Sequence, residues 1–432
     1  KPCVVGCDAI AIDEKGGKIT IGDHVVKVGD HLTINGTTGD VMIGQVETID
    51  PSISGHFAEM MGWADKIRTL KVRTNADAPA DARKAREFGA EGIGLCRTEH
   101  MFFEGERIVS FRRLILVAED VKRLRKDLET AEGEDKKKME AELAPKLKQY
   151  NQALKELLPL QRKDFTGMFK ELKGRPCTVR LLDPPLHEFL PQDDKGQAEM
   201  AKTMGVTTAV VKKVVEDLHE FNPMLGHRGC RLGITYPEVT EMQVRAIVEA
   251  AIAVPGSKPE IMIPLVGHIK EFEDQKAIAL RVIDEVKKAK KATGLSIKIG
   301  TMIEVPRAAM TADEIAKEAE FFSFGTNDLT QMGCGFSRDD AGKFLKEYVS
   351  KGIYDYDPFE VLDQKGVGRL MQYAIENGKK SRPDIKLGIC GEHGGEPSTV
   401  KFCHRIGLTY VSCSPYRVPI AILAAAQAAI EK

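Results

Sequence analysis

The stretch Lys298-Ile-Gly-Thr-Met-Ile303, followed by Phe321-Phe-Ser-Phe-Gly325, decides the fold. Both runs are short and mostly apolar, with β-branched or aromatic residues, which predicts buried strands. The segment between them, residues 304–320, is long enough for one crossover helix. Strands joined by such a crossover run parallel, so this stretch predicts an α/β fold with a parallel sheet.

The same alternation of apolar runs and helical stretches continues on both sides. Eight runs are predicted strands: Leu70–Arg73, Gly92–Cys96, Cys177–Leu181, Met224–Cys230, Glu260–Val266, Lys298–Ile303, Phe321–Gly325 and Lys386–Cys390. Tyr410–Cys413 is a possible ninth, so one candidate must be irregular, and Met224–Cys230 has the weakest pattern. Eight β/α units predict a (β/α)8 TIM-type barrel over residues 70–432.

Residues 1–50 have a different pattern. Between Lys18 and Gly36, apolar and polar residues alternate and Gly-Asp and Asn-Gly pairs interrupt them, which is typical of β-hairpins. This stretch is too short for a complete domain, and the chain begins at Lys1 rather than at Met. We therefore expect the remnant of a small domain of a longer protein, joined to the barrel by a connecting helix over residues 51–69.

A charged helical insertion is predicted over residues 104–172. Its apolar side chains recur at three- and four-residue steps: Leu143, Leu147, Tyr150, Leu154 and Leu157. Gly133 is expected to divide it into two arms. The insertion either binds a partner or packs on the barrel as a solvated hairpin. Acidic residues around Lys136–Lys138 favour the solvated hairpin.

The composition is that of a globular protein. The 432 residues include 63 Lys and Arg against 64 Asp and Glu, and 42% are apolar. This balance excludes a disordered chain and gives no support for nucleic-acid binding. No apolar run is long enough to span a membrane, and we expect Ile420–Ile430 to be the last core helix.

The cysteines indicate a reducing compartment. There are nine, an odd number, with no Cys-x-x-Cys pair. This pattern argues against a disulfide framework and against structural zinc. We expect an intracellular protein, with cytoplasm, plastid and microbody (glycosome) left open.

Arginines follow several predicted strands. Arg97 and Arg180 come at the ends of two of them, and Arg228 and Arg231 belong to Asn222–Arg231. Functional groups of such barrels gather at the carboxyl ends of the strands. Each arginine alone could form a surface salt bridge. Several together favour an anion, because the guanidinium fork matches phosphate or carboxylate oxygens.

Two carboxylates follow neighbouring predicted strands. Glu304 comes after Lys298–Ile303, and Asp328 comes shortly after Phe321–Gly325. Beside an anion site they suggest Mg²⁺, which takes one or two protein carboxylates and fills its other positions with water and substrate oxygens. Alternatively, both carboxylates pair with the arginines.

Cys390 follows the strand predicted at Lys386–Cys390, within a glycine-rich segment that lets the backbone pass close to a ligand. A thiol there suits a nucleophile or a general acid–base. A buried, inert thiol is the alternative. We expect that simpler role for Cys96, Cys230, Cys403 and Cys413.

Six motifs together resemble the phosphoenolpyruvate-utilising enzymes over nearly the whole chain. They are Gly94-Leu-Cys-Arg-Thr-Glu99, Arg180-Leu-Leu-Asp-Pro-Pro-Leu-His-Glu188, Asn222-Pro-Met-Leu-Gly-His-Arg-Gly229, Ile303-Glu-Val-Pro306, Gly325-Thr-Asn-Asp-Leu-Thr-Gln331 and Gly388-Ile-Cys-Gly-Glu-His-Gly-Gly395. The residues of these motifs match the family's pyruvate-utilising dikinases better than phosphotransferase-system enzyme I or phosphoenolpyruvate synthase, which remain the alternatives. A catalytically silent anion-binding barrel is the alternative of another class.

The resemblance implies a role for each matched cation and for the thiol. Arg97, Arg180 and Arg228 would bind the phosphoryl group of phosphoenolpyruvate, the last two as catalytic residues. Cys390 would be the acid–base that moves a proton to or from the methyl carbon of pyruvate. Arg338 would be a further arginine on the substrate side.

The resemblance also implies a metal and a carboxylate site. Glu304 and Asp328 would hold Mg²⁺, which bridges to the enolate oxygen and the carboxylate. Asn327 would hold the substrate carboxylate, and Gly325 and Thr326 of the same motif would contact substrate.

Dikinases of this family pass phosphate through a histidine on a swivelling domain. None of the ten histidines lies in a Gly-Gly-x-Thr-Ser-His-like motif, and no ATP-binding domain is recognisable. The resemblance thus implies that residues 1–50 are the end of the phosphohistidine domain. It also implies a homodimer through the barrel and no nucleic-acid or membrane partner.

Overall fold

The computed structural model describes residues 9–13, 16–36, 38–48, 53–103 and 107–431. They form two compact units, Lys1–Ser54 and Gly55–Lys432.

The first unit consists of short antiparallel strands. β1 (Ile10–Asp13), β2 (Lys18–Ile21) and β3 (His24–Lys27) form one sheet, and β4 (Leu32–Asn35) pairs with β5 (Asp40–Ile43). Ile21 pairs with His24 across a two-residue turn. Gly22 adopts a φ of +56°, which the tight turns of hairpins require.

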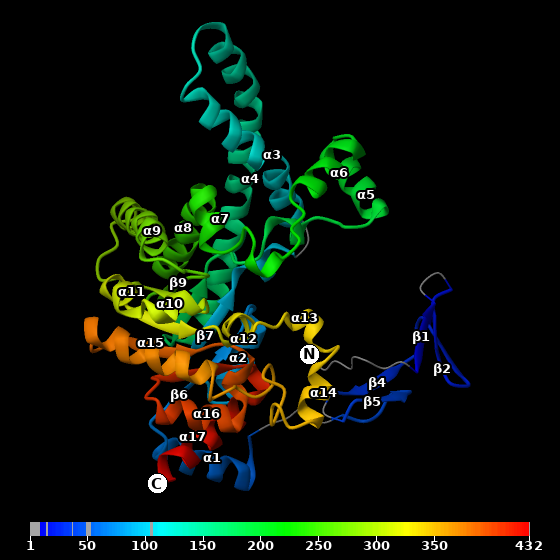
Figure 1. The fold of residues 1–432 in the computed structure, drawn as a ribbon, viewed down its shortest axis with the longest axis vertical. Helices are drawn as coiled ribbons and strands as arrows, with labels where there is room; N and C mark the ends of the chain where they lie inside the picture. The colour runs from blue at the N-terminus through cyan, green and yellow to red at the C-terminus, as the bar shows by residue number, and fades with distance from the viewer. Residues whose placement is uncertain (1–8, 14–15, 37, 49–52, 104–106, 432) are drawn as a thin grey trace. The chain divides into compact units, whose positions relative to one another are not determined.

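The second unit is built on a closed barrel of eight parallel strands (Figure 1). The strands are β6 (Lys71–Asn75), β7 (Ile93–Arg97), β8 (Pro176–Arg180), β9 (Lys258–Ile263), β10 (Lys298–Ile303), β11 (Phe321–Phe324), β12 (Lys386–Ile389) and β13 (Tyr410–Cys413). They follow one another in sequence order, and β13 closes the barrel by pairing with β6. The predicted TIM-type barrel is confirmed.

One predicted strand is wrong. Met224–Cys230 forms the end of a 3-10 turn, Pro223–Leu225, a loop, and the first residue of helix α7. Pro223 offers no N–H to a sheet, and Gly229 turns the chain with a φ of +59°. Tyr410–Cys413 supplies the eighth strand in its place.

Helices connect and cover the strands. They are α1 (Gly55–Ile67), α2 (Pro79–Glu87), α3 (Arg107–Leu128), α4 (Gly133–Leu172), α5 (Asp194–Met204), α6 (Thr208–Asp217), α7 (Cys230–Thr235), α8 (Pro237–Ala253), α9 (Ile269–Ala289), α10 (Pro306–Met310), α11 (Ala312–Glu318), α12 (Thr326–Cys334), α13 (Arg338–Ala341), α14 (Leu345–Ser350), α15 (Val367–Ser381), α16 (Pro397–Arg405) and α17 (Val418–Ile430). Single 3-10 turns lie at Thr98–Phe102, Leu186–Phe189, Pro223–Leu225, Glu392–Gly395 and Pro415–Arg417. No described helix is both long and apolar enough to cross a membrane.

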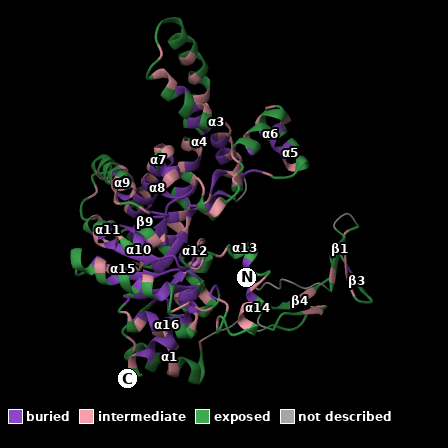
Figure 2. Ribbon diagram, viewed as in Figure 1, coloured by how far each residue is buried: buried purple, intermediate pink, exposed green. Residues whose placement is uncertain are grey.

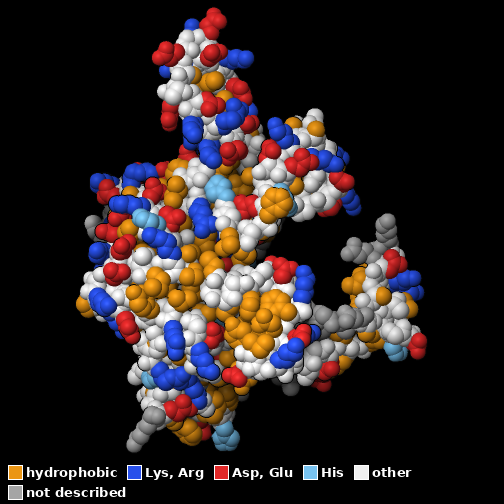
Figure 3. All heavy atoms as spheres, in the orientation of Figure 1, with side chains coloured by type: hydrophobic (Ala, Val, Ile, Leu, Met, Phe, Trp, Pro, Cys, Tyr) orange, Lys and Arg blue, Asp and Glu red, His pale blue; other side chains and the backbone are white. Residues whose placement is uncertain are grey.

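Helices α3 and α4 form the helical insertion, and α4 begins at Gly133. Their bases pack on the barrel through a cluster that includes Phe111, Tyr150 and Phe189 (Figure 2). Phe111 stacks on Phe102 with ring centroids 4.4 Å apart. Toward the tip the side chains are exposed, and Lys and Arg alternate with Asp and Glu (Figure 3).

Candidate active site

The candidate site is a cavity of about 210 Å³ at the carboxyl-terminal edge of the barrel. Residues at or just beyond the ends of β6, β7, β8, β10, β11 and β12 line it. Functional groups gather at this edge in barrels of this type. Seven residues singled out by the sequence lie on its wall: Arg97, Arg180, Glu304, Gly325, Asn327, Asp328 and Cys390.

Arg97 is the last residue of β7 and is held by Asp77. Its Nε and Nη2 donate to Asp77 Oδ2 at 3.0 and 2.7 Å, and its backbone N–H donates to Oδ1. Nδ1 of His100 lies 2.9 Å from the same Oδ2. Burial alone would raise the pKa of Asp77, but His100 and Arg97 lower it on balance. Arg97 is thus oriented by a permanent carboxylate.

Arg180 and Arg228 share Asp183. Its Oδ2 accepts from Arg180 Nη1 at 2.9 Å and from Arg228 Nη2 at 2.5 Å. Arg180 also pairs with Glu99, and all four side chains are buried. Burial opposes the charge of Arg180, yet Asp183 and Glu99 raise its pKa above the ordinary value. Both arginines therefore stay charged beside Asp183. The carboxylates that the sequence offered as partners were Glu304 and Asp328, and of these Asp328 approaches Arg228.

Arg228 reaches the site from the loop between β8 and α7 rather than from a strand end. Its Nη1 lies 3.5 Å from Asp328 Oδ1. The Nε atoms of both Arg180 and Arg228 are buried and have no hydrogen-bond partner among the described residues. Each guanidinium thus keeps an unused donor.

Glu304 follows β10 and is fully buried. Its Oε1 accepts from the Leu265 N–H at 2.6 Å, and Leu265 adopts a φ of +59°, which is rare for a residue other than glycine. Its Oε2 accepts no hydrogen bond from a described donor. Burial, followed by the charges of Asp328 and Asp183, raises the pKa of Glu304 well above the ordinary value.

Asp328 lies in the first turn of α12, and burial raises its pKa as well. Two buried carboxyl groups side by side, one with an unpartnered oxygen, fit a divalent cation, which would relieve both desolvation and repulsion. No cluster of three or more Asp, Glu, His or Cys side chains suited to a metal occurs among the described residues. Two carboxylates would leave the other positions of such a cation to water and substrate oxygens.

Cys390 follows β12 and is buried against Leu95, Met262 and Met302. Its Sγ lies 3.7 Å from the Phe324 carbonyl oxygen. Burial raises the pKa of the thiol to about 12, despite the opposing effect of Arg180. Cys390 therefore carries its proton at neutral pH.

Not every predicted site residue reaches the cavity. Thr326 is buried behind it, with Oγ1 2.7 Å from Nδ1 of His393. Arg338 is exposed at the start of α13, and its backbone N–H donates to Gln331 Oε1. Arg228 does not line the cavity itself and approaches it through Asp328.

The family model described as "PEP-utilising enzyme, PEP-binding domain" matches residues 52–430. The chain belongs to the phosphoenolpyruvate-utilising enzymes. The pyruvate, phosphate dikinase of Clostridium symbiosum is 54% identical over 433 residues, which cover 99% of this chain and 46% of that protein. The chloroplastic pyruvate, phosphate dikinase of Mesembryanthemum crystallinum is 52% identical, with 99% and 43% covered. The pyruvate, phosphate dikinase of Rhizobium meliloti (strain 1021) is 50% identical, with 99% and 45% covered. The chain thus spans less than half the length of these curated relatives.

This phosphoenolpyruvate-utilising enzyme has site residues that our sequence reasoning missed. Asn75, His100 and Met302 line the cavity, and Asp77 orients Arg97. Asn75 donates from Nδ2 to the Cys390 carbonyl and accepts from Ser412 Oγ at 2.6 Å. Asn75 and Asp77 lie two and four residues after the first predicted strand, Leu70–Arg73. Reading past the end of that strand would have named them as candidates, but not Asp77 as the partner of Arg97.

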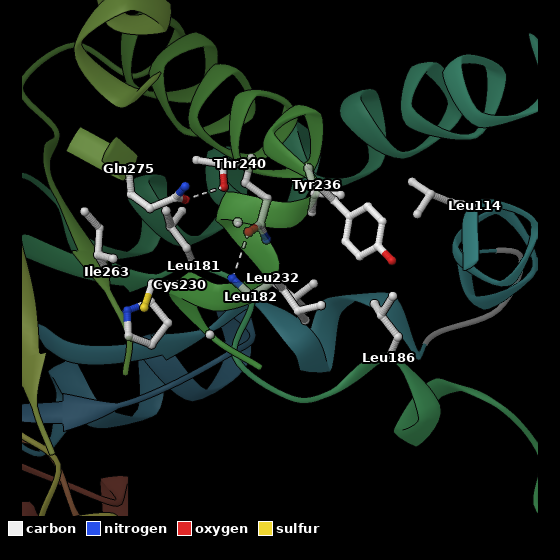
Figure 4. Close-up of a pocket in the computed structure, with 15 residues that line it drawn as sticks. Leu114, Leu181, Leu182, Leu186, Cys230, Leu232, Tyr236, Thr240, Ile263 and Gln275 are labelled. Carbon is white, nitrogen blue, oxygen red and sulfur yellow. Dashed lines mark hydrogen bonds between the residues drawn. The ribbon is translucent and has the colours of Figure 1, made fainter. Parts of the chain in front are cut away.

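A second cavity of this family member lies beside the site and is not part of it (Figure 4). Its volume is about 20 Å³, and it lies among β8, β9, α3, α7 and α8. Most of its lining is apolar, and its polar side chains have partners, as Thr240 has in Gln275 and Gln243 has in the Leu182 N–H. It has room for about one water molecule, and we interpret it as a packing gap.

Proposed function

We propose that this chain forms the pyruvate/phosphoenolpyruvate half-site of a pyruvate, phosphate dikinase. The whole enzyme would interconvert ATP, phosphate and pyruvate with AMP, diphosphate and phosphoenolpyruvate through a phosphohistidine. One observation carries the proposal. A single cavity brings together charged arginines, two buried carboxyl groups and a protonated thiol.

Arg97, Arg180 and Arg228 would bind the phosphoryl group. Phosphoryl transfer places little covalent demand on the protein, so cations that are already in place supply most of the catalysis. Asp77 and Asp183 hold these guanidinium groups before substrate arrives. Arg338 would approach only if α13 moves toward the cavity.

Glu304 and Asp328 would hold Mg²⁺, which stabilises negative charge on the enolate oxygen of pyruvate when bound. Gly325 is needed beside them, because a Cβ there would lie 2.8 Å from Glu304 Oε2. Asn327 Oδ1 accepts from the Glu392 N–H at 3.4 Å, which leaves the amide N–H groups free for the substrate carboxylate. Thr326 supports this segment from behind.

Cys390 would act as the acid–base. When pyruvate forms, its thiol gives its proton to the methylene carbon of the enolate; in the reverse direction the thiolate removes a proton from the methyl group. The raised pKa suits the donating role, because the thiol keeps its proton until the basic enolate carbon is present.

The remaining parts of the proposal concern the longer protein. Residues 1–50 would be the end of a swivelling phosphohistidine domain, residues 51–69 the connecting helix, and residues 70–432 the barrel with its insertion at 104–172. A histidine outside this chain would bring the phosphoryl group. We also propose a homodimer through the barrel and a reducing intracellular compartment, consistent with the free cysteines among the described residues.

Calorimetric binding of oxalate, a planar mimic of the pyruvate enolate, tests the metal–enolate site. We expect the full-length protein to bind oxalate only with Mg²⁺ and Glu304→Ala to abolish that binding. Oxalate binding that is equally tight without Mg²⁺, or no binding at all, would refute the site.

The thiol is tested by hydrogen exchange at the pyruvate methyl group, followed by NMR. Cys390→Ala should keep oxalate affinity and lose this exchange. Unchanged exchange would remove Cys390 from the mechanism. A protein truncated to these residues should bind oxalate but make no phosphoenolpyruvate from ATP and pyruvate.

A further inference from the structure

His393 is a buried histidine that the proposed function does not use. It lies in the 3-10 turn Glu392–Gly395, and its side chain is fully buried. Both ring nitrogens have partners: Nδ1 lies 2.7 Å from Thr326 Oγ1, and Nε2 lies 3.0 Å from the Pro358 carbonyl oxygen.

These partners determine the tautomer. A carbonyl oxygen only accepts, so Nε2 carries the hydrogen and donates it to Pro358. Burial lowers the pKa of His393, which favours the neutral ring. Nδ1 of a neutral ring is then an acceptor, and the hydroxyl hydrogen of Thr326 is directed at it.

The Thr326 bond joins two parts of the candidate site. Thr326 is the first residue of α12, which carries Asn327 and Asp328, whereas His393 follows Cys390 by three residues. The two segments are in close contact, since a Cβ on Gly391 would lie 2.1 Å from Thr326 Oγ1. The Glu392–Asn327 hydrogen bond adds a second link between them.

We propose that His393 is a positioning residue, which sets the start of α12 relative to the Cys390 segment by accepting a hydrogen bond from Thr326. The inference rests on the proposed function, because it concerns the geometry of the same site. A displacement of about 1 Å in a catalytic arrangement costs on the order of 100-fold in rate, so one bond that fixes two segments has a large effect.

Two substitutions separate the two bonds of the ring. In Asn, Oδ1 occupies the place of the histidine Nδ1, so His393→Asn keeps the acceptor for Thr326 and loses the donor to Pro358. In Gln, the amide reaches the place of Nε2, so His393→Gln keeps the donor and loses the acceptor. Thr326→Val removes the hydroxyl at nearly constant volume, and Thr326→Ser retains it.

The test is Mg²⁺-dependent oxalate binding to the full-length protein, with thermal unfolding measured alongside. We expect His393→Gln and Thr326→Val each to weaken binding by about tenfold or more. The double variant, His393→Gln with Thr326→Val, should bind oxalate no more weakly than the weaker-binding single variant, because both substitutions remove the same Thr326–His393 hydrogen bond. His393→Asn and Thr326→Ser should stay within about threefold of the unsubstituted protein. His404→Gln in α16, away from the cavity, is the control.

Which of the two His393 variants loses more oxalate affinity decides between a positioning role and simple space filling. If the ring only filled space, His393→Asn would lose more oxalate affinity than His393→Gln, because Asn is smaller than Gln and leaves more empty volume. That order, or additive effects of His393→Gln and Thr326→Val, would overturn the inference and leave the proposed function in place. Absence of Mg²⁺-dependent binding in the unsubstituted protein would refute the proposed function and this inference with it.

Discussion

Glu304 shows a conflict between stability and function at a single residue. Its raised pKa means that the folded state holds the proton more tightly than the unfolded state. The corresponding stability is present at low pH and is lost as the pH rises through the ordinary carboxyl range toward the raised pKa. At neutral pH, without metal, the buried Glu304 carboxyl group therefore opposes folding, because the fold must either bury its charge or take up a proton.

Glu304→Gln should make this conflict visible. We expect it to raise the free energy of unfolding in EDTA at pH 8 by about 1–3 kcal/mol, because the neutral amide keeps the shape and has neither a charge to bury nor a proton to take up. The same variant should lose the stabilisation that Mg²⁺ gives the unsubstituted protein. Thermal unfolding with and without Mg²⁺ measures both effects. A lower midpoint in EDTA would contradict this interpretation.

Single residues also show where sequence reasoning stops. Arg97 and Arg180 could be placed from the sequence, because each ends an apolar run and parallel strands bring their ends together. The partner of Arg97 could not, since the contact with Asp77 depends on how β6 and β7 align. That pair has an irregular register near Asn75, which no local pattern predicts.

At the scale of elements, the loop between β8 and α7 explains the one wrong strand. Met224–Cys230 is apolar enough to resemble a strand, but the run contains two glycines and follows a proline. The segment instead forms a loop that places Arg228 against Asp183 and Asp328. The Gly229 N–H donates to the backbone carbonyl oxygen of Asp183 at 2.8 Å, so the loop is fixed to the residue whose carboxylate binds Arg228.

Gly229→Ala should therefore damage the site through its loop. Gly229 has a φ of +59°, and a Cβ on this residue would lie 2.7 Å from the Cβ of Leu265. The Leu265 N–H in turn donates to Glu304. We expect a loss of about 1–3 kcal/mol in stability and weaker Mg²⁺-dependent oxalate binding. Gly256→Ala, with a φ of +81° and no described atom near its Cβ, is the control. It should lower stability and leave oxalate affinity unchanged; equal affinities in both variants would contradict the argument.

The α3–α4 arm is an element whose tip lies outside the candidate site. Its base is buried in the cluster around Phe111 and Tyr150, whereas the tip is exposed (Figure 2) and charged (Figure 3). Replacing residues 127–141 with a short glycine-rich linker should leave oxalate affinity and phosphoenolpyruvate turnover within about twofold. Removing Tyr150 as well should unfold the base. A large loss of turnover on replacing the tip alone would contradict the interpretation of the tip as a solvated hairpin.

At the scale of the whole barrel, the two ends have different roles. The carboxyl-terminal edge holds the candidate site, as the sequence predicted from the strand ends. Deeper in the barrel, Glu260 Oε2 accepts from Arg73 Nη1 at 2.9 Å and from Thr178 Oγ1 at 2.7 Å, and Lys386 also pairs with Glu260. These residues join β6, β8, β9 and β12. The sequence contains each residue, but only the closed barrel brings strands so far apart in the chain to one carboxylate.

This buried cluster gives the barrel a pH dependence of its own. Burial opposes the charge of Glu260, but Arg73 and Lys386 lower its pKa to about 2. The stability it contributes is present above the ordinary carboxyl pKa and is lost as the pH falls toward 2. Glu260→Gln should lower the free energy of unfolding at pH 7 by about 3–5 kcal/mol, because it leaves the buried Arg73 without its carboxylate. It also removes the charge that supports protonated Lys386, whose pKa burial already lowers to about 8.

Denaturant unfolding between pH 2 and pH 7 measures that difference, which should narrow as the pH approaches 2 because the unsubstituted protein then loses the same charge. Glu285→Gln is the control, since Glu285 pairs with Arg245 and Arg281 at the surface, where solvent screens the interaction. It should leave the unfolding midpoint unchanged at every pH. A difference between Glu260→Gln and the unsubstituted protein that stays constant down to pH 2 would mean that Glu260 supports the barrel by its shape and not by its charge.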